Sequence, residues 1–471
     1  MPGQPGLVAV VLAAGQGKRM KSRVPKVLHS VAGRPLVHYP VAAALEAGAT
    51  QVIVVVSPES QAAIEAHVNA AFPPGAVRTA VQTVARGTGD AAKVALEGGA
   101  GAAFTRVLVL CGDTPLVRAS ELRLLLGALD SESAKLALLS CEPPDPRGYG
   151  RVIRDATGRA LSVQEDRDLD AASRETLREV NAGVYAVDGT TLREGLATLR
   201  ADNSQGEYYL TDVVAYAAGQ RGAVAVKGSP DALVGVNDRS QLSQAEEAMY
   251  RRIAERHRVA GVTVRGDARI DDTVEISIDA CIEAGACLRG NTTVGEGALV
   301  DVGAVVTDTT IAAGANVRAY SVLDGSRIGA RAEIGPFARI RPGSDIEEEA
   351  HIGNFVEAKK THMGRGAKAN HLAYLGDGEI GAGANVGAGT IFCNYDGFVK
   401  HVTVIGEGAF IGSDSQLVAP VRIGKGAYVA TGTTVTQDVP DDALAIGRTK
   451  QENKLGYASR LKSRLAARKK K

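Results

Sequence analysis

The feature that most constrains the fold of this chain is an aliphatic residue at every sixth position of its second half. Eight consecutive positions at this spacing are aliphatic, namely Val264, Ile270, Ile276, Ile282, Leu288, Val294, Val300 and Val306. With 45% of residues hydrophobic, such a run would arise by chance about once in 600 placements. After one-residue shifts the spacing resumes and continues to Val435. A helix repeats every 3.6 residues and a half-buried strand every 2. A six-residue repeat instead predicts a parallel β-helix, with short strands stacked coil upon coil around an aliphatic core. A Gly-rich loop region is the alternative.

Two interruptions break this register. The six-residue spacing is lost between Lys359 and Tyr374 and again between Asn394 and His401. Breaks in a stack of similar coils expel loops, which often carry function, so we expect a surface loop at each break. Four of the eight histidines lie at or near the breaks: His351, His362, His371 and His401. Taken singly, each is better explained as an ordinary surface or hydrogen-bonded residue. Their spacing to cysteines and carboxylates disfavours a zinc site.

Length, charge and cysteine content set the broad class of the protein. A chain of 471 residues is too long for one core, so two or three domains are expected. Its net charge of +1 provides no bulk attraction to nucleic acid or anionic membrane. The five cysteines form no CxxC pair, which favours a reducing compartment over a disulfide framework. No apolar run approaches the length of a membrane-spanning helix. We therefore predict a cytoplasmic protein that neither binds nucleic acid nor inserts into a membrane.

The first half of the chain has the pattern of an α/β domain. Residues 1–237 alternate short apolar segments with Ala-rich amphipathic stretches, which predicts a mostly parallel sheet covered on both faces. The expected strands are Leu7–Ala13, Gln51–Val56, Arg106–Leu110 and Lys135–Leu139. Residues 238–260 are predicted to form one charged linker helix, with a partner-binding helix as the alternative. The β-helix is expected over residues 261–440 and a basic tail over residues 441–471.

The turn after the first strand has the composition of a phosphate-binding loop. In the segment Leu12–Met20, glycines such as Gly15 let backbone amides approach a ligand, and a cluster of cations that includes Arg19 and Lys26 follows. The segment is not a Walker A loop, and Met20 stands where a dinucleotide fingerprint has its third glycine. An ordinary strand-to-helix turn is the alternative. The clustered cations favour a polyphosphate ligand.

A carboxylate follows another buried strand, in the segment Gly112-Asp113-Thr114-Pro115. Ligands of open α/β sheets bind at the carboxyl ends of strands, and Mg²⁺ prefers carboxylate oxygens alongside substrate phosphates. Asp113 is therefore a candidate Mg²⁺ ligand. The alternative is that Asp113 or Thr114 caps a helix that starts at Pro115.

These motifs in combination resemble one known family. The chain contains LAAGxGxRM from Leu12, Pro25-Lys26-Val27-Leu28, the Gly-Asp-x-Pro turn and a C-terminal hexapeptide repeat. From Leu7 to about Arg448 it is similar to the bacterial bifunctional UDP-N-acetylglucosamine pyrophosphorylase / glucosamine-1-phosphate N-acetyltransferase family. The resemblance implies an α/β nucleotidyltransferase domain with a Rossmann-like, mostly parallel sheet, followed by a left-handed parallel β-helix. It also implies a homotrimer whose acetyltransferase sites are built from neighbouring subunits.

The resemblance implies a uridine-nucleotide site in the first domain. Its binding residues would be Leu12, Ala13, Ala14, Gly15, Lys26, Gln82, Gly87, Thr88, Asp113, Gly150, Glu165, Asn181 and Asn237. Asp113 and Asn237 would bind Mg²⁺, and Arg19 and Lys26 would neutralise charge during the reaction. The hallmark segment 203–212 would line the sugar pocket. Lys18, Ala85 and Cys111 depart from the usual family residues, which affects contacts to the base and phosphates.

The resemblance implies an acetyltransferase site in the β-helix, on motifs such as Cys393-Asn394-Tyr395-Asp396-Gly397. His371 would be the general base, with Glu357 orienting or tuning it and Asn394 also catalytic. Glucosamine-1-phosphate would bind to Arg341, Lys359, Tyr374, Asn385 and Lys400. Acetyl-CoA would bind to Ala388, Asn394, Tyr395, Ser413, Thr431 and Arg448. Thr431 stands where the family usually has alanine, and its larger side chain would narrow the groove expected to bind acetyl-CoA.

The leading prediction is therefore an enzyme with two reactions, using acetyl-CoA and UTP as co-substrates and Mg²⁺ as cofactor. It would acetylate glucosamine-1-phosphate and then couple the product to UTP, which gives UDP-N-acetylglucosamine and pyrophosphate. The alternative is a sugar-1-phosphate nucleotidyltransferase with one reaction and a β-helix that serves only regulation or trimerisation. A non-catalytic trimerisation scaffold is a third possibility, which the polar cluster between His371 and Asn394 disfavours.

Overall fold

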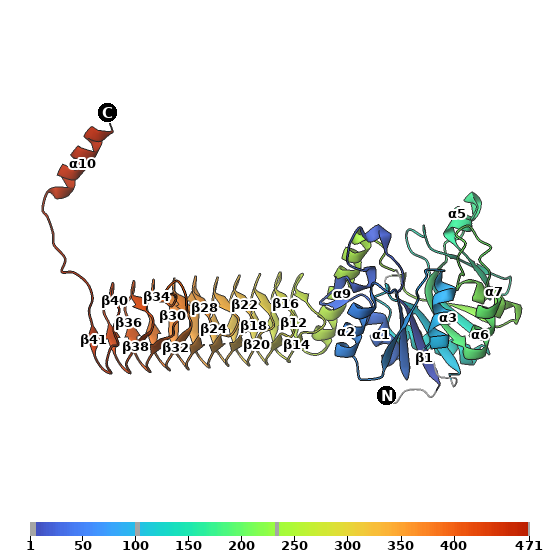
Figure 1. Cartoon of the computed structure of the whole chain (residues 1–471), viewed down its shortest axis with the longest axis horizontal. Coiled ribbons are helices and arrows are strands. Elements are labelled where there is room, and N and C mark those ends of the chain that lie inside the picture. The colour runs from blue at the N-terminus through green and yellow to red at the C-terminus, as the bar shows by residue number, and fades with distance from the viewer. Residues whose placement is uncertain (1–5, 99–103, 231–234, 470–471) are drawn as a thin grey trace. The chain divides into compact units, whose positions relative to one another are not determined.

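The computed structural model describes residues 6–98, 104–230 and 235–469. The chain folds into two compact units, one ending at Ile253 and the other beginning at Ala254. The first is a helix-covered sheet and the second a stack of short strands (Figure 1). The division falls inside helix α9, Arg239–Val259, which occupies the predicted linker.

The first unit is built on a nine-stranded sheet. Its central order is β11 (Ala223–Lys227), β7 (Leu136–Cys141), β10 (Val180–Asp188), β6 (Arg106–Cys111), β1 (Leu7–Leu12), β4 (Gln51–Val56) and β5 (Val77–Val81). All neighbouring pairs in this order are parallel except those of β10. A hairpin of β8 (Arg151–Arg154) and β9 (Ala160–Gln164) extends from β10. The four strands predicted from sequence are all present; β4 has the predicted bounds, and the ends of the other three differ by at most two residues.

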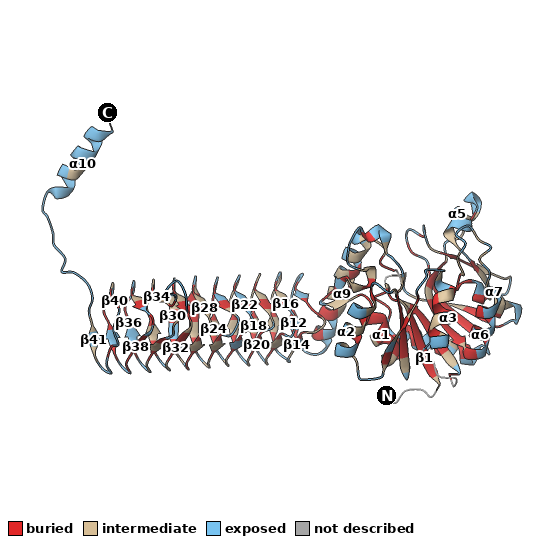
Figure 2. Ribbon diagram, viewed as in Figure 1, coloured by how far each residue is buried: buried red, intermediate tan, exposed pale blue. Residues whose placement is uncertain are grey.

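Both faces of this sheet are buried, which explains the continuous apolar runs of its strands. Alternate residues of each strand enter two separate cores. One core contains residues of α1 (His38–Glu46), α2 (Gln61–Ala71) and α4 (Ala119–Ser131). The other contains residues of α3 (Thr88–Gly98), α6 (Gly189–Thr198) and α7 (Asp212–Gly219). Figure 2 shows the buried strands between these helices. A short helix, α5 (Ala171–Thr176), contributes no buried residue.

The second unit is a parallel β-helix with three faces. Its sheets have eleven, ten and nine strands, and each strand pairs with the strand three places later in sequence, except that β39 (Tyr428–Val429) pairs with β41 (Leu444–Ala445). The stack begins at β12 (Thr263–Val264) and ends at β41 (Leu444–Ala445), so it passes the predicted boundary at residue 440. Aliphatic residues of the six-residue register stack inside, as in Val264 beneath Ile282. Glycine at a corner lets neighbouring coils approach: a Cβ at Gly329 would lie 2.5 Å from backbone atoms of Glu347 and Glu348.

The loop predicted between Lys359 and Tyr374 is wrong, because the chain stays within the stack there. Strands β28 (Glu357–Lys359), β29 (His362–Met363), β30 (Lys368–His371) and β31 (Tyr374–Gly376) continue all three sheets. Three less typical core residues replace the aliphatic ones. Ala358 lies between Ile340 and Leu375, Met363 between Ile346 and Ile380, and Ala369 between Ile352 and Val386. The six-residue pattern of aliphatic residues did not reveal these coils because alanine and methionine fill their core positions.

The second predicted loop is confirmed. Between β34 (Ile391–Cys393) and β35 (Thr403–Ile405) the chain leaves the stack, and Tyr395 pairs with Lys400 in an antiparallel bridge. After β41 the chain forms an exposed helix, α10 (Tyr457–Arg468), none of whose residues is buried. Among the described residues, no helix combines the length and hydropathy needed to cross a membrane.

Two candidate active sites

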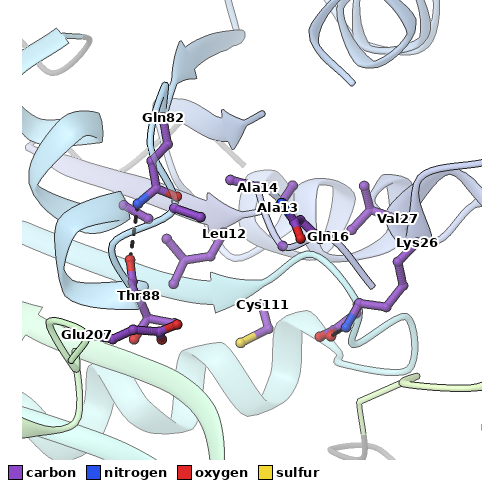
Figure 3. Close-up of a pocket in the computed structure, with 15 residues that line it drawn as sticks. Leu12, Ala13, Ala14, Gln16, Lys26, Val27, Gln82, Thr88, Cys111 and Glu207 are labelled. Atoms are coloured by element: carbon purple, nitrogen blue, oxygen red, sulfur yellow. Dashed lines mark hydrogen bonds and ion pairs between the residues drawn. The ribbon is translucent and has the colours of Figure 1, made fainter. Parts of the chain in front are cut away.

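The first candidate site is a cavity at the carboxyl ends of β1 and β6, where Leu12 and Cys111 lie side by side. Its volume is about 350 Å³. It is lined by the predicted residues Leu12, Ala13, Ala14, Gly15, Lys26, Gln82, Gly87, Thr88 and Asp113, and by Gln16, Val27, Ala85, Ala91, Cys111 and Glu207 (Figure 3). Most of the predicted nucleotide-binding residues thus line one cavity, although they come from four segments of the chain.

One wall of this cavity depends on glycine at position 87. Gly87 has φ +107°, and a Cβ there would lie 2.5 Å from the carbonyl oxygen of Tyr208. The close approach lets the Tyr208 carbonyl accept a hydrogen bond from the Gly89 amide at 2.8 Å. Gln82 is fixed beside it, because its side-chain amide donates to the Gly87 carbonyl at 3.2 Å and to Asp90 at 2.8 Å. The segment 203–212 is therefore fastened to the loop that carries Gly87 and Thr88.

A second cavity of about 530 Å³ shares Gln16 and Lys26 with the first, and it is more polar. Its lining residues are Gln16, Gly17, Lys18, Arg19, Lys26, Gly148, Glu165, Asp166, Arg167, Gln205 and Asn237. Because the two cavities share residues, one elongated anionic ligand can extend from the first into the second. Sequence reasoning did not single out Asp166 or Arg167, since neither belongs to a motif with a recognised chemistry.

The oxygens of Asp113 and Asn237 converge on one cationic group. The Lys26 ammonium forms an ion pair with Asp113 and lies 3.4 Å from the Asn237 side-chain oxygen. Arg19 donates to the same Asn237 oxygen at 2.8 Å. The side chains of Lys26 and Asp113 are only 13% and 19% exposed, so this cluster is partly shielded from water. A carboxylate and an amide oxygen that already share a cation fit the ligand preference of Mg²⁺.

The turn after β6 is not a helix start. α4 begins at Ala119, and the Arg118 amide donates to Glu121 at 2.8 Å as the helix N-cap. The alternative that Asp113 or Thr114 caps a helix starting at Pro115 is therefore wrong. Thr114 instead donates its hydroxyl to the Cys111 carbonyl at 2.7 Å. This turn leaves the Asp113 side chain directed at Lys26.

Three predicted sugar-site residues form a separate group. The backbone N–H of Asn181 donates to the Gly150 carbonyl at 2.8 Å. A Cβ at Gly150 would lie 3.5 Å from both carboxylate oxygens of Glu165. Burial raises the pKa of Glu165, which accepts a hydrogen bond from Thr211 at 3.1 Å. Of the three, only Glu165 lines the second cavity. The Asn181 side chain is engaged internally, donating to the Tyr185 hydroxyl at 2.6 Å and accepting from the Gly183 amide at 3.0 Å.

The second candidate site lies on the β-helix, and its cations occupy matching positions of successive coils. Arg341 of β25 (Arg339–Arg341) pairs in register with Lys359 of β28. The Lys359 ammonium lies 4.0 Å from Asp377, and it lowers the pKa of Lys400 because the two ammonium groups are adjacent. Lys400 is brought there by the loop between β34 and β35. Two neighbouring ammonium groups beside an arginine favour binding of a phosphate.

Tyr374 and Asn394 meet above a glycine. A Cβ at Gly376 would lie 2.6 Å from the Tyr374 hydroxyl and 2.7 Å from the Asn394 side-chain nitrogen. Asn394 donates to Asp377 at 2.6 Å, so the cluster continues to Lys359. Asn385 lies on a different face, in β33 (Asn385–Val386), which pairs with the strand of His371.

His371 stands at the end of a row of short side chains. Its carboxyl-side neighbour Leu372 has a positive φ, and so do Gly389, Asp414 and Gly432 at the same corner of later coils. Backbone hydrogen bonds link this corner from coil to coil, as in Asp414 to Ala388 at 2.7 Å and Gly432 to Ser413 at 2.9 Å. The residues that precede these corner positions are therefore aligned: His371, Ala388, Ser413 and Thr431. Arg448 donates to the carbonyl of Thr431 and closes the row.

Two contacts in this site differ from those expected. Among the described residues, no hydrogen bond or ion pair joins Glu357 to His371; Glu357 accepts a hydrogen bond from Arg341 at 2.8 Å. The imidazole contacts Asn354 instead, with 2.8 Å between Nδ1 of His371 and Oδ1 of Asn354. Sequence reasoning missed this role of Asn354, because the partner of His371 is set by the register of β27 and β30. Tyr395 lies on the loop between β34 and β35 and is exposed.

Comparison with known proteins agrees with both units. Residues 9–180 match the MobA-like NTP transferase domain family, and residues 403–437 match the bacterial transferase hexapeptide family. These matches confirm the fold class predicted from the sequence. That class is a nucleotidyltransferase domain followed by a left-handed parallel β-helix of hexapeptide repeats.

Full-length relatives carry one name. A bifunctional protein GlmU of Sorangium cellulosum is 59% identical over 465 residues, covering 98% of this chain and 97% of the relative. Those of Anaeromyxobacter sp. strain Fw109-5 and Pelobacter propionicus are 50% and 44% identical, covering 97% of this chain and 93% and 99% of the relatives. The prediction of two activities in one chain is thereby favoured over the alternative with a purely regulatory or assembling β-helix. The chain belongs to the family of bifunctional GlmU proteins.

Proposed function

We propose that this chain makes UDP-N-acetylglucosamine in two steps, each on its own unit. The β-helix transfers the acetyl group of acetyl-CoA to the amine of glucosamine-1-phosphate. The α/β unit then joins the N-acetylglucosamine-1-phosphate to the uridylyl group of UTP and releases pyrophosphate. The observation that best supports both steps is the presence of two separate polar sites, one around Lys26 and Asp113 and one around His371 and Lys359.

In uridylyl transfer, the sugar phosphate oxygen attacks the α-phosphorus of UTP and pyrophosphate leaves, so the protein supplies no nucleophile. Arg19 and Lys26 offset the charge of the two anionic reactants. The first cavity takes the nucleoside part, and the second takes the phosphates and the sugar beside Glu165. Asp113 and Asn237 would bind Mg²⁺, which when bound supplies further charge neutralisation to the phosphates. Gly150 and Asn181 act indirectly, because the hydrogen bond between their backbones positions the Gly150 segment next to Glu165.

In acetyl transfer, the amine of glucosamine-1-phosphate attacks the thioester carbonyl, and the carbon–sulfur bond breaks to release CoA. His371 accepts the proton that the amine loses. Arg341, Lys359 and Lys400 bind the sugar phosphate, with Tyr374 and Asn385 orienting the sugar. Glu357 orients Arg341, its partner in the structure. Acetyl-CoA lies along Ala388, Ser413 and Thr431 towards Arg448, and Asn394 and Tyr395 flank its reactive end.

A ladder of exposed aromatic residues supports assembly into a homotrimer. Tyr320, Phe337 and Phe355 are each about half exposed and stack with centroid distances of 5.5 and 5.6 Å. They occupy the same corner of the β-helix as Leu372, which is also exposed. Exposed apolar patches of this kind commonly mark interfaces between proteins. All five cysteines are unpaired, which fits the reducing cytoplasm where we place the enzyme.

Release of CoA tests this function most simply. The purified full chain is incubated with acetyl-CoA and glucosamine-1-phosphate, and free thiol is measured. Glucosamine-6-phosphate serves as the control, because it carries the same groups with the phosphate elsewhere. We expect release with the 1-phosphate, followed by pyrophosphate release when UTP and Mg²⁺ are added. Pyrophosphate release from supplied N-acetylglucosamine-1-phosphate without any CoA release would limit the β-helix to assembly.

A further inference from the structure

We propose that Asn354 is the positioning residue of the acetyl-transfer site, holding the imidazole of His371 in the tautomer that accepts the amine proton. The inference rests on the proposed function, in which His371 is the base. Its basis is the distance of 2.8 Å between Asn354 Oδ1 and His371 Nδ1. A side-chain carbonyl oxygen can only accept a hydrogen bond. The hydrogen therefore resides on Nδ1, and the lone pair on Nε2 is left for the substrate.

The backbone fixes this pair from both sides. Asn354 ends β27 (His351–Asn354) and His371 ends β30 (Lys368–His371), and the two residues are directly paired in register. The Leu372 amide donates to the Asn354 carbonyl at 3.1 Å, so the corners that follow the two residues are joined as well. The strands approach closely because Gly353 has no side chain: a Cβ there would lie 2.0 Å from the carbonyl oxygen of Asn370.

No carboxylate competes for this role among the contacts of His371 in the described chain. Glu357 is paired with Arg341 at 2.8 Å, on another face of the β-helix. The titratable or charged group on the neighbouring strand β27 is His351, and Lys368 lies on the strand of His371 itself. His351 lies 3.9 Å from Glu333 and interacts electrostatically with His371. A neutral amide beside the base orients the ring without adding a charge that would favour the protonated imidazole.

Two substitutions separate positioning from mere packing. Asn354→Leu keeps the size of the side chain and removes the acceptor, so we expect kcat for acetyl transfer to fall by about 10- to 100-fold. KM for acetyl-CoA should change little. Asn354→Asp keeps the acceptor and adds a charge, so activity should be retained at alkaline pH. The acid limb of its pH–rate profile should move to higher pH by about one unit or more, because the carboxylate favours the protonated imidazole.

The controls are Asn291→Leu, the same change at an exposed position of an earlier coil, and His371→Ala. Asn291→Leu should leave both kcat and the pH profile unchanged. If His371→Ala is inactive while Asn354→Leu matches the wild type and Asn354→Asp has an unshifted profile, the positioning role is overturned and the base assignment stands. If His371→Ala retains full turnover, the base assignment itself fails, and the role of Asn354 fails with it. Thermal unfolding of each variant identifies losses that come from misfolding.

Discussion

Asp396 shows how a single exposed residue shapes the acetyl-transfer site. It accepts hydrogen bonds at 2.8 Å from His401 and from the amides of Phe398 and Val399, all within the loop between β34 and β35. These hydrogen bonds hold the pKa of Asp396 well below its usual range, and the bond from His401 has the largest effect. The same loop carries Lys400 to Lys359. Asp396 therefore stabilises the loop that carries Lys400, and we expect it to affect phosphate binding without touching the substrate.

We expect Asp396→Ala to raise KM for glucosamine-1-phosphate by about five- to tenfold, the equivalent of roughly one lost hydrogen bond. Its kcat should fall less than its KM rises, because His371 lies on β30, outside the loop, whereas Lys400 lies within it. Steady-state kinetics check this, with Asp267→Ala as the control: Asp267 also accepts a backbone hydrogen bond, from Gly285 at 3.0 Å, in the first coils. A fall in kcat with KM unchanged would contradict the assigned role.

The sign of the pH effect follows from the lowered pKa. A carboxyl group whose pKa is lowered by folding stabilises the folded protein. This stabilisation is fully present at a pH above the pKa of the group in the unfolded chain, and it is lost as the pH falls through the pKa of the group in the folded protein. The loop should therefore remain ordered through neutral and mildly acidic pH, and lose order only in strong acid. Protonation of Asp396 consequently does not account for an acid limb of acetyl transfer near neutral pH.

At the level of elements, the coil that carries the acetyl-transfer residues was the hardest to predict. The six-residue register identified the β-helix because aliphatic side chains fill most inward positions. It failed at Ala358, Met363 and Ala369, since inward-facing alanine and methionine give no periodic signal that differs from a loop. The contact of His371 with Asn354 was equally hidden, because two residues seventeen apart in sequence meet only through strand register. The chemistry-bearing residues were found through motif resemblance rather than through periodicity.

Helix α9 is a second element whose role differs from a simple connection. Gln241 in its first turn accepts a hydrogen bond from the Asn237 amide at 2.8 Å, and Arg252 donates to the Leu116 carbonyl at 2.8 Å. Both contacts lie within the first compact unit, which extends to Ile253. A domain boundary at residue 237 would remove the support of Asn237, a proposed Mg²⁺ ligand.

We therefore expect a fragment of residues 1–253 to keep uridylyl transfer and a fragment of residues 1–237 to lose most of it. Both should be monomeric, because the exposed aromatic ladder lies in the β-helix, whereas the full chain should be a trimer. Pyrophosphate release and light scattering on the three proteins test this. Equal activity of the two fragments would show that α9 is dispensable, and a trimeric 1–253 fragment would show that the assembly contacts lie outside the β-helix.

On the scale of the whole molecule, the two proposed active sites share no residue. The nucleotide site uses the carboxyl edge of a sheet, where backbone turns and cations gather. The acetyl-transfer site uses the outer surface of a stack, where each coil adds one residue to a row. Neither cluster includes a residue of the other. Lys26 contacts Asp113 and Asn237, and Arg19 contacts Asn237. In the β-helix, His371 contacts Asn354 and Lys359 contacts Asp377.

Measuring both reactions on two single variants of the full chain tests this separation most directly. Asp113→Ala should lower uridylyl transfer by about 10²- to 10³-fold and leave acetyl transfer within about twofold of the wild type, because the two proposed sites are built from different residues on different units. His371→Ala should do the opposite, lowering kcat for acetyl transfer by about 10²- to 10⁴-fold with uridylyl transfer intact. If either variant, shown to be folded, loses both activities to a similar extent, the assignment of one reaction to each unit is contradicted.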